Sequence, residues 1–384
     1  MARRLTIIGV TAIALLILAI GTRRDVHGLT LVVRAADLHG IGRRLADIDA
    51  VPIREWVVQI PLRTGSIRGR AYVPIGKARQ TVLLVSGLNP AGIDEPRLET
   101  LARRLAEANV SVVTPEIPEL SRFEVTPSIT DHIEDAALWL AAQSGLAPAG
   151  RIGLMGISFS GGLAVVAAGR PSLENRLLYV FSFGGHDDLR RVLEFFCTGL
   201  ETDAVAAVLP PPHDYGVAVV LLNVAEQLVP REQVGPLRDA VRRFLWASYL
   251  DRFDKPSAER EFTALREVAR ALPEPAATLL EYVNERDVAH LGPLLRPYVD
   301  VYVNRPGLSP ARSSAPSAPV YLLHGRDDDV IPAAESRRLA DRLRGRVPVR
   351  LLVTELISHA DADQPAHISD VAKLASFWGD LLDR

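Results

Sequence analysis

The feature that most constrains the fold is an apolar run that ends in a glycine and leads, through one serine, into a second apolar segment. The run is Arg151-Ile-Gly-Leu-Met-Gly-Ile-Ser-Phe-Ser-Gly-Gly162, and Leu-Ala-Val-Val-Ala-Ala follows at 163–168. The pattern predicts a strand, a tight turn with Ser158 at its apex, and a helix. Strand and helix approach closely at such a turn and the serine backbone is strained, so the flanking residues must be small. Four residues meet this requirement: Gly156, Ser160, Gly161 and Gly162.

Two serines compete for the apex of this turn. With Ser158 there, the strand runs to Met155 and Gly156 stands two residues before the hydroxyl. With Ser160 there, Ser158 and Gly162 take the flanking places. The first register fits the strand end better, so we expect Ser158 to be a nucleophile on a nucleophile elbow. A glycine-rich turn without chemistry is the alternative, because short motifs of this kind also occur by chance.

The N-terminus predicts a membrane segment. Residues 5–21 form an uncharged, apolar run of 17 residues, with arginine pairs at 3–4 and 23–24. This length is near the lower limit for crossing a hydrocarbon layer of roughly 30 Å, and it is long for the core of a cleaved signal peptide. We therefore expect residues 1–24 to form an N-terminal transmembrane helix that makes the protein membrane-associated. Secretion after cleavage near Gly21 is the alternative, and the flanking charges do not decide the topology.

The rest of the chain alternates predicted strands and helices. After a polar, weakly helical connection at 25–54, residues 56–62 and 67–73 predict an antiparallel hairpin. Six apolar runs predict further strands, at 81–85, 110–115, 151–155, 177–182, 319–323 and 349–354. Helical patterns stand between them, so the fold class is α/β, with a mostly parallel sheet and helices on both faces.

One long helical stretch interrupts this alternation. From His186 to Ser317 the pattern is helical, and a Pro- and Ser-rich linker at 305–319 leads back to the strands. We therefore expect three parts: the membrane segment at 1–24, an α/β core at 25–185 and 318–384, and a helical cap, or lid, at 186–317. The aromatic residues of this cap are expected to pack between its helices rather than to line a pocket.

Carboxylates follow the strand predicted at 319–323. Ligands bind beyond the carboxyl ends of strands in open sheets, which is also where the serine turn lies. A serine hydroxyl needs a base to take its proton and a carboxylate to orient that base. We expect Asp328 to be this carboxylate, since it stands three residues after a His-Gly pair and just before an apolar-Pro step. Asp187 and Asp188 are the alternatives.

The base is expected after the last strand. His359 lies there and completes the order Ser, Asp, His along the chain. His367 is closer to the final helix and is expected to be exposed or to cap that helix. His324 precedes the acidic loop and is expected to be structural.

An oxyanion hole requires two backbone N–H donors. One is expected from Phe159, the residue after the nucleophile. The other is expected from Leu88, in the glycine-containing loop after the strand at 81–85, with Gly87 and Asn89 as alternatives.

Taken in order over residues 56–384, the loop at 86–92, the serine turn, the acidic loop and His359 resemble the α/β-hydrolase family with a helical cap. The resemblance implies a serine hydrolase that forms an acyl-enzyme with a small-molecule acyl substrate, most often a carboxylic ester. Ser160 departs from the family pattern, which has glycine there. The same triad would serve a thioesterase, a peptidase or an acyltransferase, and a non-catalytic ligand-binding protein is the further alternative.

Composition excludes several other classes. The net charge of −2 means that the chain lacks the excess of positive charge by which proteins bind nucleic acid. The single cysteine, Cys197, excludes an intramolecular disulfide and a cysteine-based zinc site. His186-Asp-Asp188 and His213-Asp214 have no diagnostic metal-ligand spacing, so we expect no metal and no cofactor.

Overall fold

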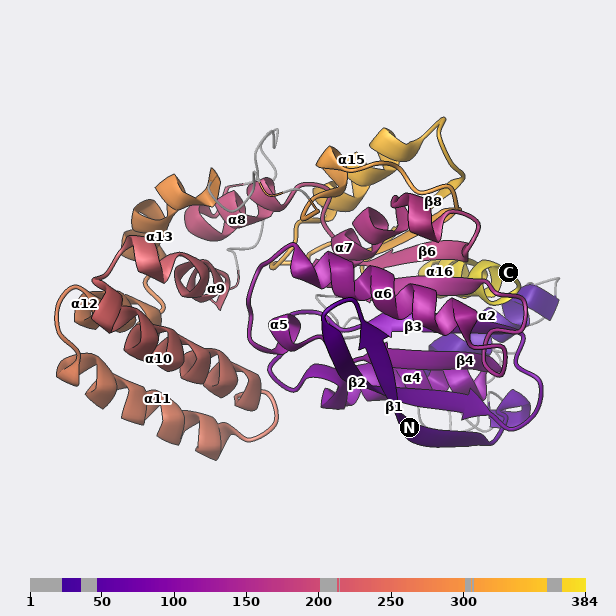
Figure 1. The fold of residues 1–384 in the computed structure, drawn as a ribbon, viewed down its shortest axis with the longest axis horizontal. Helices are drawn as coiled ribbons and strands as arrows, with labels where there is room; N and C mark the ends of the chain where they lie inside the picture. The colour runs from indigo at the N-terminus through magenta and orange to yellow at the C-terminus, as the bar shows by residue number, and fades with distance from the viewer. Residues whose placement is uncertain are drawn as a thin grey trace, which may run out of the picture.

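The structure is a computed structural model that describes residues 23–35, 47–200, 213, 215–300, 305, 307–357 and 368–384. Its centre is an eight-stranded sheet with the order β1-β2-β4-β3-β5-β6-β7-β8 (Figure 1). The strands are β1 (Ile53–Leu62), β2 (Gly65–Pro74), β3 (Gln80–Val85), β4 (Val110–Pro115), β5 (Ile152–Ile157), β6 (Leu177–Phe183), β7 (Val320–Gly325) and β8 (Val349–Thr354). The β1–β2 and β2–β4 pairings are antiparallel and the other five are parallel, so the sheet is mixed.

Each face of the sheet has its own hydrophobic core. Side chains alternate between faces along a strand. Leu83 and Leu154 pack with the first core, whereas Leu84 and Met155 pack with the second. The first core is covered by α6 (Ser128–Ala142), α7 (Phe159–Ala168) and α15 (Ala333–Leu343), and the second by α2 (Arg23–Ala35), α4 (Pro96–Glu107) and α16 (Ile368–Leu382). Burial on both faces explains why β3 and β4 are apolar almost throughout.

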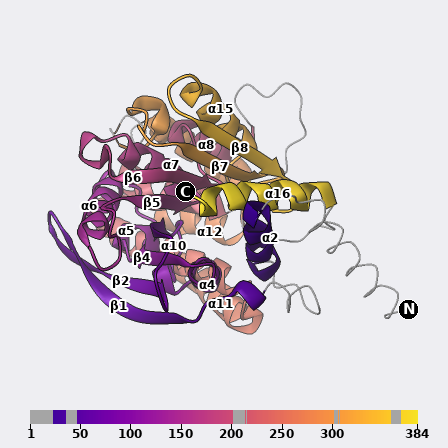
Figure 2. The ribbon, with the colours of Figure 1, turned by 90° about the vertical axis from the view of Figure 1, so that its right-hand side faces the viewer.

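Helix α2 occupies part of the segment for which the sequence predicts a polar, weakly helical connection. It lies beside α16 (Figure 2), although the two helices are at opposite ends of the chain. Leu29 and Val33 of α2 are buried together with Ala375 of α16. A Cβ atom on Gly28 would overlap the carbonyl oxygen of Ala375, so the two backbones approach closely only because residue 28 is glycine.

The prediction of an N-terminal transmembrane helix is corrected by the structure. Among the described residues, none of the helices combines the length and the apolar character needed to cross a bilayer. The apolar run at 5–21 lies outside the described residues. The first described helix, α2, packs its apolar side chains onto α16. The described fold is a mixed sheet covered on both faces by helices.

A helical insertion stands between β6 and β7 and forms a group of its own at one end of the sheet (Figure 1). Its main helices are α8 (Leu189–Thr198), α9 (Tyr215–Val224), α10 (Arg231–Leu250), α11 (Lys255–Ala271), α12 (Ala276–Asn284) and α13 (Val288–Leu295). Helix α9 is apolar on all sides and contacts α8, α10 and α13. A helix of this kind is stable only when others surround it, which is why the insertion folds around α9.

Candidate active site

Ser158 occupies the strained turn between β5 and α7. Its backbone has φ 54° and ψ −128°. Non-glycine residues rarely adopt such a positive φ, and holding one there costs on the order of 1–3 kcal/mol. The Ser158 N–H donates to the carbonyl of Phe183 at 2.6 Å, and the Gly161 N–H donates to the carbonyl of Ser158 at 2.8 Å. These bonds fix the serine at the carboxyl end of a central strand, next to the end of β6.

Small neighbours make this turn possible. A Cβ atom on Gly156 would overlap the backbone carbonyl of Ser160, so only glycine fits at position 156. Ser160 is 0% exposed within the first turn of α7, and its Oγ has no hydrogen-bond partner among the described residues. Ser158, in contrast, lines a cavity. Of the two serines that compete in the sequence, Ser158 is the one a ligand can reach.

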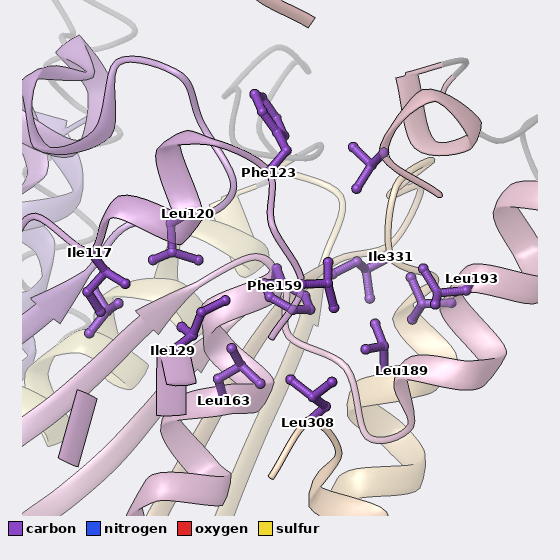
Figure 3. Close-up of a cluster of buried hydrophobic side chains, with 14 of the residues drawn as sticks. Ile117, Leu120, Phe123, Ile129, Phe159, Leu163, Leu189, Leu193, Leu308 and Ile331 are labelled. Atoms are coloured by element: carbon purple, nitrogen blue, oxygen red, sulfur yellow. The ribbon is translucent and has the colours of Figure 1, made fainter. Parts of the chain in front are cut away.

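The cavity has a volume of about 510 Å³ and lies between the sheet and the helical insertion. This size is typical of sites for small molecules. Phe159 and Ile331 line it together with Leu189 and Leu193 of α8, and these four side chains lie close together in the buried cluster (Figure 3). The insertion adds further apolar walls: Val192, Phe196, Val219 and Leu245. Of the aromatic residues of the insertion, Phe196 and Tyr249 face the cavity, whereas Trp246 and Phe253 are exposed.

The loop after β3 passes directly beside the serine. A Cβ atom on Gly87 would lie 3.2 Å from the Cβ and 3.8 Å from the Oγ of Ser158. Leu88 and Phe159, the two predicted oxyanion-hole residues, both line the cavity. Phe159 is the first residue of α7, where backbone N–H groups have no acceptor within the helix. The N–H of Asn89 donates to the carbonyl of Leu120 at 3.3 Å, so this alternative donor is already engaged.

Asp328 is held by the backbone of its own loop. Its side chain is 4% exposed, and its Oδ1 accepts hydrogen bonds from the N–H groups of Val330 and Ile331, both at 2.9 Å. Its Oδ2 lies 3.4 Å from Nε2 of His324. Of the three carboxylates in the loop, Asp327 is exposed and Asp329 is half-buried. Asp328 is therefore the one whose direction the fold determines.

His324 is part of the framework around this acid. Its Nε2 lies 2.7 Å from the carbonyl of Ile331, and its Nδ1 lies 2.6 Å from Oγ of Ser336. A carbonyl only accepts, so Nε2 donates to Ile331. Both nitrogens thus have structural partners, and the ring ties the acidic loop to α15.

The alternative acids have other partners. Arg342 donates to Asp187 through Nε at 2.8 Å and Nη2 at 2.9 Å, and Arg191 donates through Nη2 at 2.8 Å. Asp188 accepts from the N–H of Arg190 at 3.0 Å and caps α8. The carboxylate of Asp187 therefore joins the insertion to the core, whereas that of Asp188 caps the first helix of the insertion.

The predicted base, His359, lies outside the described residues, as does His367. The structure describes the chain up to Ile357, just after β8. The end of β8 is aligned with the end of β7, because Thr354 pairs with Gly325. The chain therefore enters the region of His359 from the same edge of the sheet that carries Asp328.

Some cavity residues were missed by the sequence analysis. Arg97, Arg252, His213 and Tyr215 all line the cavity. The N–H of His213 donates to the carbonyl of Asp329 at 2.9 Å, and its ring lies 4.4 Å from that of Tyr215. Burial, followed by the negative charge of Asp328, raises the pKa of Tyr215 far above its usual value. The only sequence signal nearby is a run of three prolines before His213, which indicates a loop but no chemistry.

Metal chemistry has no candidate site in the part of the chain that the structure describes, because no cluster of three His, Cys, Asp or Glu side chains is placed to hold an ion. His186, one of the residues considered for such a role, is fully buried and its ring stacks on Phe159 with a centroid distance of 5.4 Å. Burial also raises the pKa of the Cys197 thiol to about 12, so this side chain stays protonated and packs as an apolar group.

No family model matches the chain, and no curated protein sequence matches it. Among solved structures, it is similar to an esterase of Pyrobaculum calidifontis, with 17% identity over 89% of this chain and 88% of that chain and a TM-score of 0.46. It is also similar to an acylaminoacyl peptidase of Pyrococcus horikoshii, with 13% identity over 90% of this chain but only 44% of the peptidase, and a TM-score of 0.49. A dienelactone hydrolase from Anabaena variabilis gives 18% identity over 85% and 96% of the two chains, with a TM-score of 0.42. Likeness at this level does not extend to an activity of this chain.

Proposed function

We propose that this protein is a serine hydrolase that cleaves carboxylic esters through an acyl-enzyme on Ser158. The observation that carries the proposal is the strained Ser158 at the wall of a largely apolar cavity, between the loop of Gly87 and the loop of Asp328. A serine held in this way is exposed to a ligand while its backbone remains fixed. A mostly apolar cavity of this size suits an acyl chain or an apolar alcohol.

In the proposed reaction, His359 accepts the proton of Ser158 as Oγ attacks the ester carbonyl. The backbone N–H groups of Phe159 and Leu88 stabilise the resulting oxyanion. The tetrahedral intermediate collapses, the alcohol leaves with the proton from His359, and the acyl group remains on Ser158. A water molecule then attacks the acyl-enzyme by the same steps, which releases the acid and restores the serine.

The proposed roles of Asp328 and His359 rest on orientation and reach. The two N–H groups that bind Oδ1 of Asp328 direct the carboxylate without bringing a counter-charge. An acid in this state can orient an imidazole and stabilise its protonated form. His359 is the fifth residue after Thr354, and five residue steps span at most about 18 Å. This length is enough to cross from the end of β8 to the loop of Asp328, its neighbour at the end of β7.

We further propose that the insertion is a cap, with residues 186–317 as its boundaries. It supplies the apolar side of the cavity through α8, α9 and α10. Exclusion of water from such a site strengthens the interactions that stabilise the oxyanion. The same triad can act on esters, thioesters and amides, so activity toward ester, thioester and amide analogues of one acyl group should be measured side by side.

The proposal is tested with Ser158→Ala and its matched control, Ser160→Ala. Ser158→Ala should abolish labelling by a fluorophosphonate probe and lower the hydrolysis of 4-nitrophenyl butyrate by a factor on the order of 10⁴ or more. Ser160→Ala should retain both activities, because this side chain is buried and has no reacting partner. Unchanged turnover in Ser158→Ala would rule the mechanism out. A folded wild-type protein that neither reacts with the probe nor hydrolyses esters would instead be a binding protein.

A further inference from the structure

The exposure of its lining residues identifies where the cavity of Ser158 opens to solvent. Two of these residues are exposed, Thr100 of α4 and Arg252 in the turn between α10 and α11, and the others are buried or half-buried. Helix α4 belongs to the core and α10 to the insertion, and the α10–α11 turn lies on the side of the insertion that faces the core (Figure 1). The mouth of the cavity therefore lies between α4 and this turn.

Three aromatic rings lie beside this mouth and contact one another. Tyr249 lines the cavity, and the centroid of its ring lies 5.4 Å from that of Trp246 and 5.2 Å from that of Phe253. Trp246 and Phe253 stand outside the lining, with 41% of the first and 53% of the second exposed. We call these three residues the aromatic row. Its middle ring belongs to the cavity and its two outer rings to the surface, so the row continues the cavity outward.

The middle ring also approaches the core. Burial, followed by the negative charge of Glu95, raises the pKa of Tyr249. Glu95 is the N-cap of α4, and its Oε2 accepts the N–H of Leu98 at 2.7 Å. A charge shifts the pKa of another group only when the two are near each other. Tyr249 and the start of α4 therefore face one another at the mouth, and a group that leaves the cavity there passes along Tyr249 to the outer rings.

The angles between the rings indicate which kind of group fits the aromatic row. The ring planes of Trp246 and Tyr249 meet at 33°, and those of Tyr249 and Phe253 meet at 52°. A rigid flat group can stack on one of these rings but not on all three, because offset stacking requires nearly parallel planes. A flexible alkyl chain rotates about each of its bonds, so it can contact the rings in turn and leave water. The row is thus suited to an alkyl chain.

On the basis of the proposed function, we propose that the substrate is a carboxylic ester with a long, unbranched acyl chain whose far part lies on the aromatic row. The ester carbonyl lies at Ser158, the first part of the chain fills the cavity, and the last methylenes pass Tyr249 to the outer rings. Trp246 and Phe253 are then specificity-determining residues. They contact a part of the substrate that takes no part in the bond changes, and the oxyanion hole and triad remain as described above.

The test uses 4-nitrophenyl esters of straight-chain acids, from butyric to lauric acid, each below its critical micelle concentration. In the wild-type protein, kcat/KM should rise up to the longest ester, because each methylene that leaves water contributes a factor of up to about four. The double variant Trp246→Ala/Phe253→Ala should lower kcat/KM for the laurate about five-fold, as one or two methylenes return to water, and leave the butyrate unchanged. The matched control is Trp56→Ala, because Trp56 is 42% exposed on β1 and stands outside the lining of the cavity. It should leave the dependence on chain length unchanged.

Hydrolysis of the butyrate reports folding and catalysis in every variant, so it separates this inference from the proposed function. The inference is overturned and the hydrolase function stands if the butyrate is hydrolysed through Ser158 but kcat/KM does not rise with chain length. The same conclusion follows if the double variant leaves the rise unchanged, or if Trp56→Ala reduces it equally. If no ester is hydrolysed and Ser158 is not labelled, both are overturned.

Discussion

Two aspartates at the ends of neighbouring strands have similar surroundings in the sequence but different partners in the structure. Asp187 follows β6 and Asp328 follows β7, and these strands are paired in parallel. Both side chains are buried, with 0% of Asp187 and 4% of Asp328 exposed. Residue type, burial and topological position therefore do not distinguish them.

The partners of Asp187 are charged. It belongs to a junction network that consists of Asp187, Arg191, Glu335 and Arg342. Oε2 of Glu335 accepts the N–H groups of Asp187 and Asp188 at 3.0 and 2.9 Å, and its Oε1 accepts Nε of Arg191 at 2.7 Å. The network connects the first helix of the insertion, α8, with α15 of the core. Arg338 of α15 also donates to Oε1 of Glu335, through Nη1 at 3.1 Å.

The described hydrogen-bond partners of Asp328 are neutral backbone groups. The N–H groups of Val330 and Ile331 fix its direction but bring no full positive charge. A carboxylate oriented by backbone amides can in turn orient an imidazole and stabilise its protonated form. From this comparison we propose that Asp187 is structural and that Asp328 is the acid of the triad.

The largest effect is expected from Asp328→Asn. Asparagine keeps an oxygen for the two backbone N–H groups, so the free energy of unfolding should change by less than about 1 kcal/mol. Loss of the negative charge should reduce ester hydrolysis by a factor on the order of 10⁴, because the imidazole is no longer held in the required tautomer. Steady-state kinetics and denaturant unfolding measure the two effects. Full turnover in this variant would remove Asp328 from the proposed triad.

Asp187→Asn should give the opposite pattern. It leaves Arg191 and Arg342 without their carboxylate, and breaking a buried ion pair by removing one partner costs about 3 kcal/mol. The kcat of the folded protein should remain within about three-fold of wild type, since no step of the proposed reaction uses Asp187. Denaturant unfolding and active-site titration before kinetics separate stability from turnover.

Asp188→Asn is the matched control for Asp187→Asn. Asp188 caps α8 through its side chain, and asparagine is an equally good N-cap, so stability should change by less than about 1 kcal/mol. A loss of kcat in Asp187→Asn as large as in Asp328→Asn, at unchanged stability, would contradict the distinction between the two acids.

The serine turn and the sheet were predictable from sequence because both follow local rules. Gly156 is required by a contact with Ser160 only four residues away, and the strands of the parallel part of the sheet are continuous apolar runs. Asp328 is likewise oriented by N–H groups two and three residues further along its own loop. Short-range geometry of this kind is repeated in unrelated sequences, so a pattern can identify it.

Other features depend on contacts between distant parts of the chain. Helix α2 has a polar composition and becomes a packed helix only because α16 covers its apolar side. Arg97 of the core and Arg252 of the insertion line the same cavity, and nothing in the sequence near either of them indicates this. The transmembrane prediction rested on the hydropathy of residues 5–21 alone, and no described helix supports it. His359 remains a sequence prediction.

The smallest expected effect is on the pH dependence of stability, and it comes from His186, which lies between the two regions compared above. It directly precedes Asp187, and its ring stacks on Phe159, the residue after the nucleophile. Its Nε2 donates to the carbonyl of Leu308 at 2.8 Å, and its Nδ1 has no hydrogen-bond partner among the described residues. Burial lowers the pKa of His186, because a protonated ring would carry a charge into an apolar site.

The sign of the pH effect follows from this lowered pKa. In the unfolded chain a histidine titrates at about pH 6.5. Below that pH the unfolded state therefore binds a proton that the folded state does not. The stabilisation from neutral His186 is therefore complete above about pH 6.5 and is lost as the pH falls below it, by at most about 1.4 kcal/mol per pH unit. His186→Gln keeps a donor for the carbonyl of Leu308 but cannot titrate. Between pH 7 and 5.5 the free energy of unfolding should therefore fall less for this variant than for wild type. At pH 7 the variant should be the less stable of the two.

His132→Gln is the control of opposite sign. His132 lies 3.3 Å from Glu119, and the interaction with this carboxylate raises the pKa of His132. The stabilisation that His132 contributes is thus present below about pH 6.5 and is lost as the pH rises through its folded-state pKa. With His132→Gln, the free energy of unfolding should fall more steeply than in wild type as the pH is lowered. With His186→Gln it should fall less steeply. Equal slopes for wild type and His186→Gln would show that His186 binds a proton in the folded protein as readily as in the unfolded chain, and would contradict the lowered pKa.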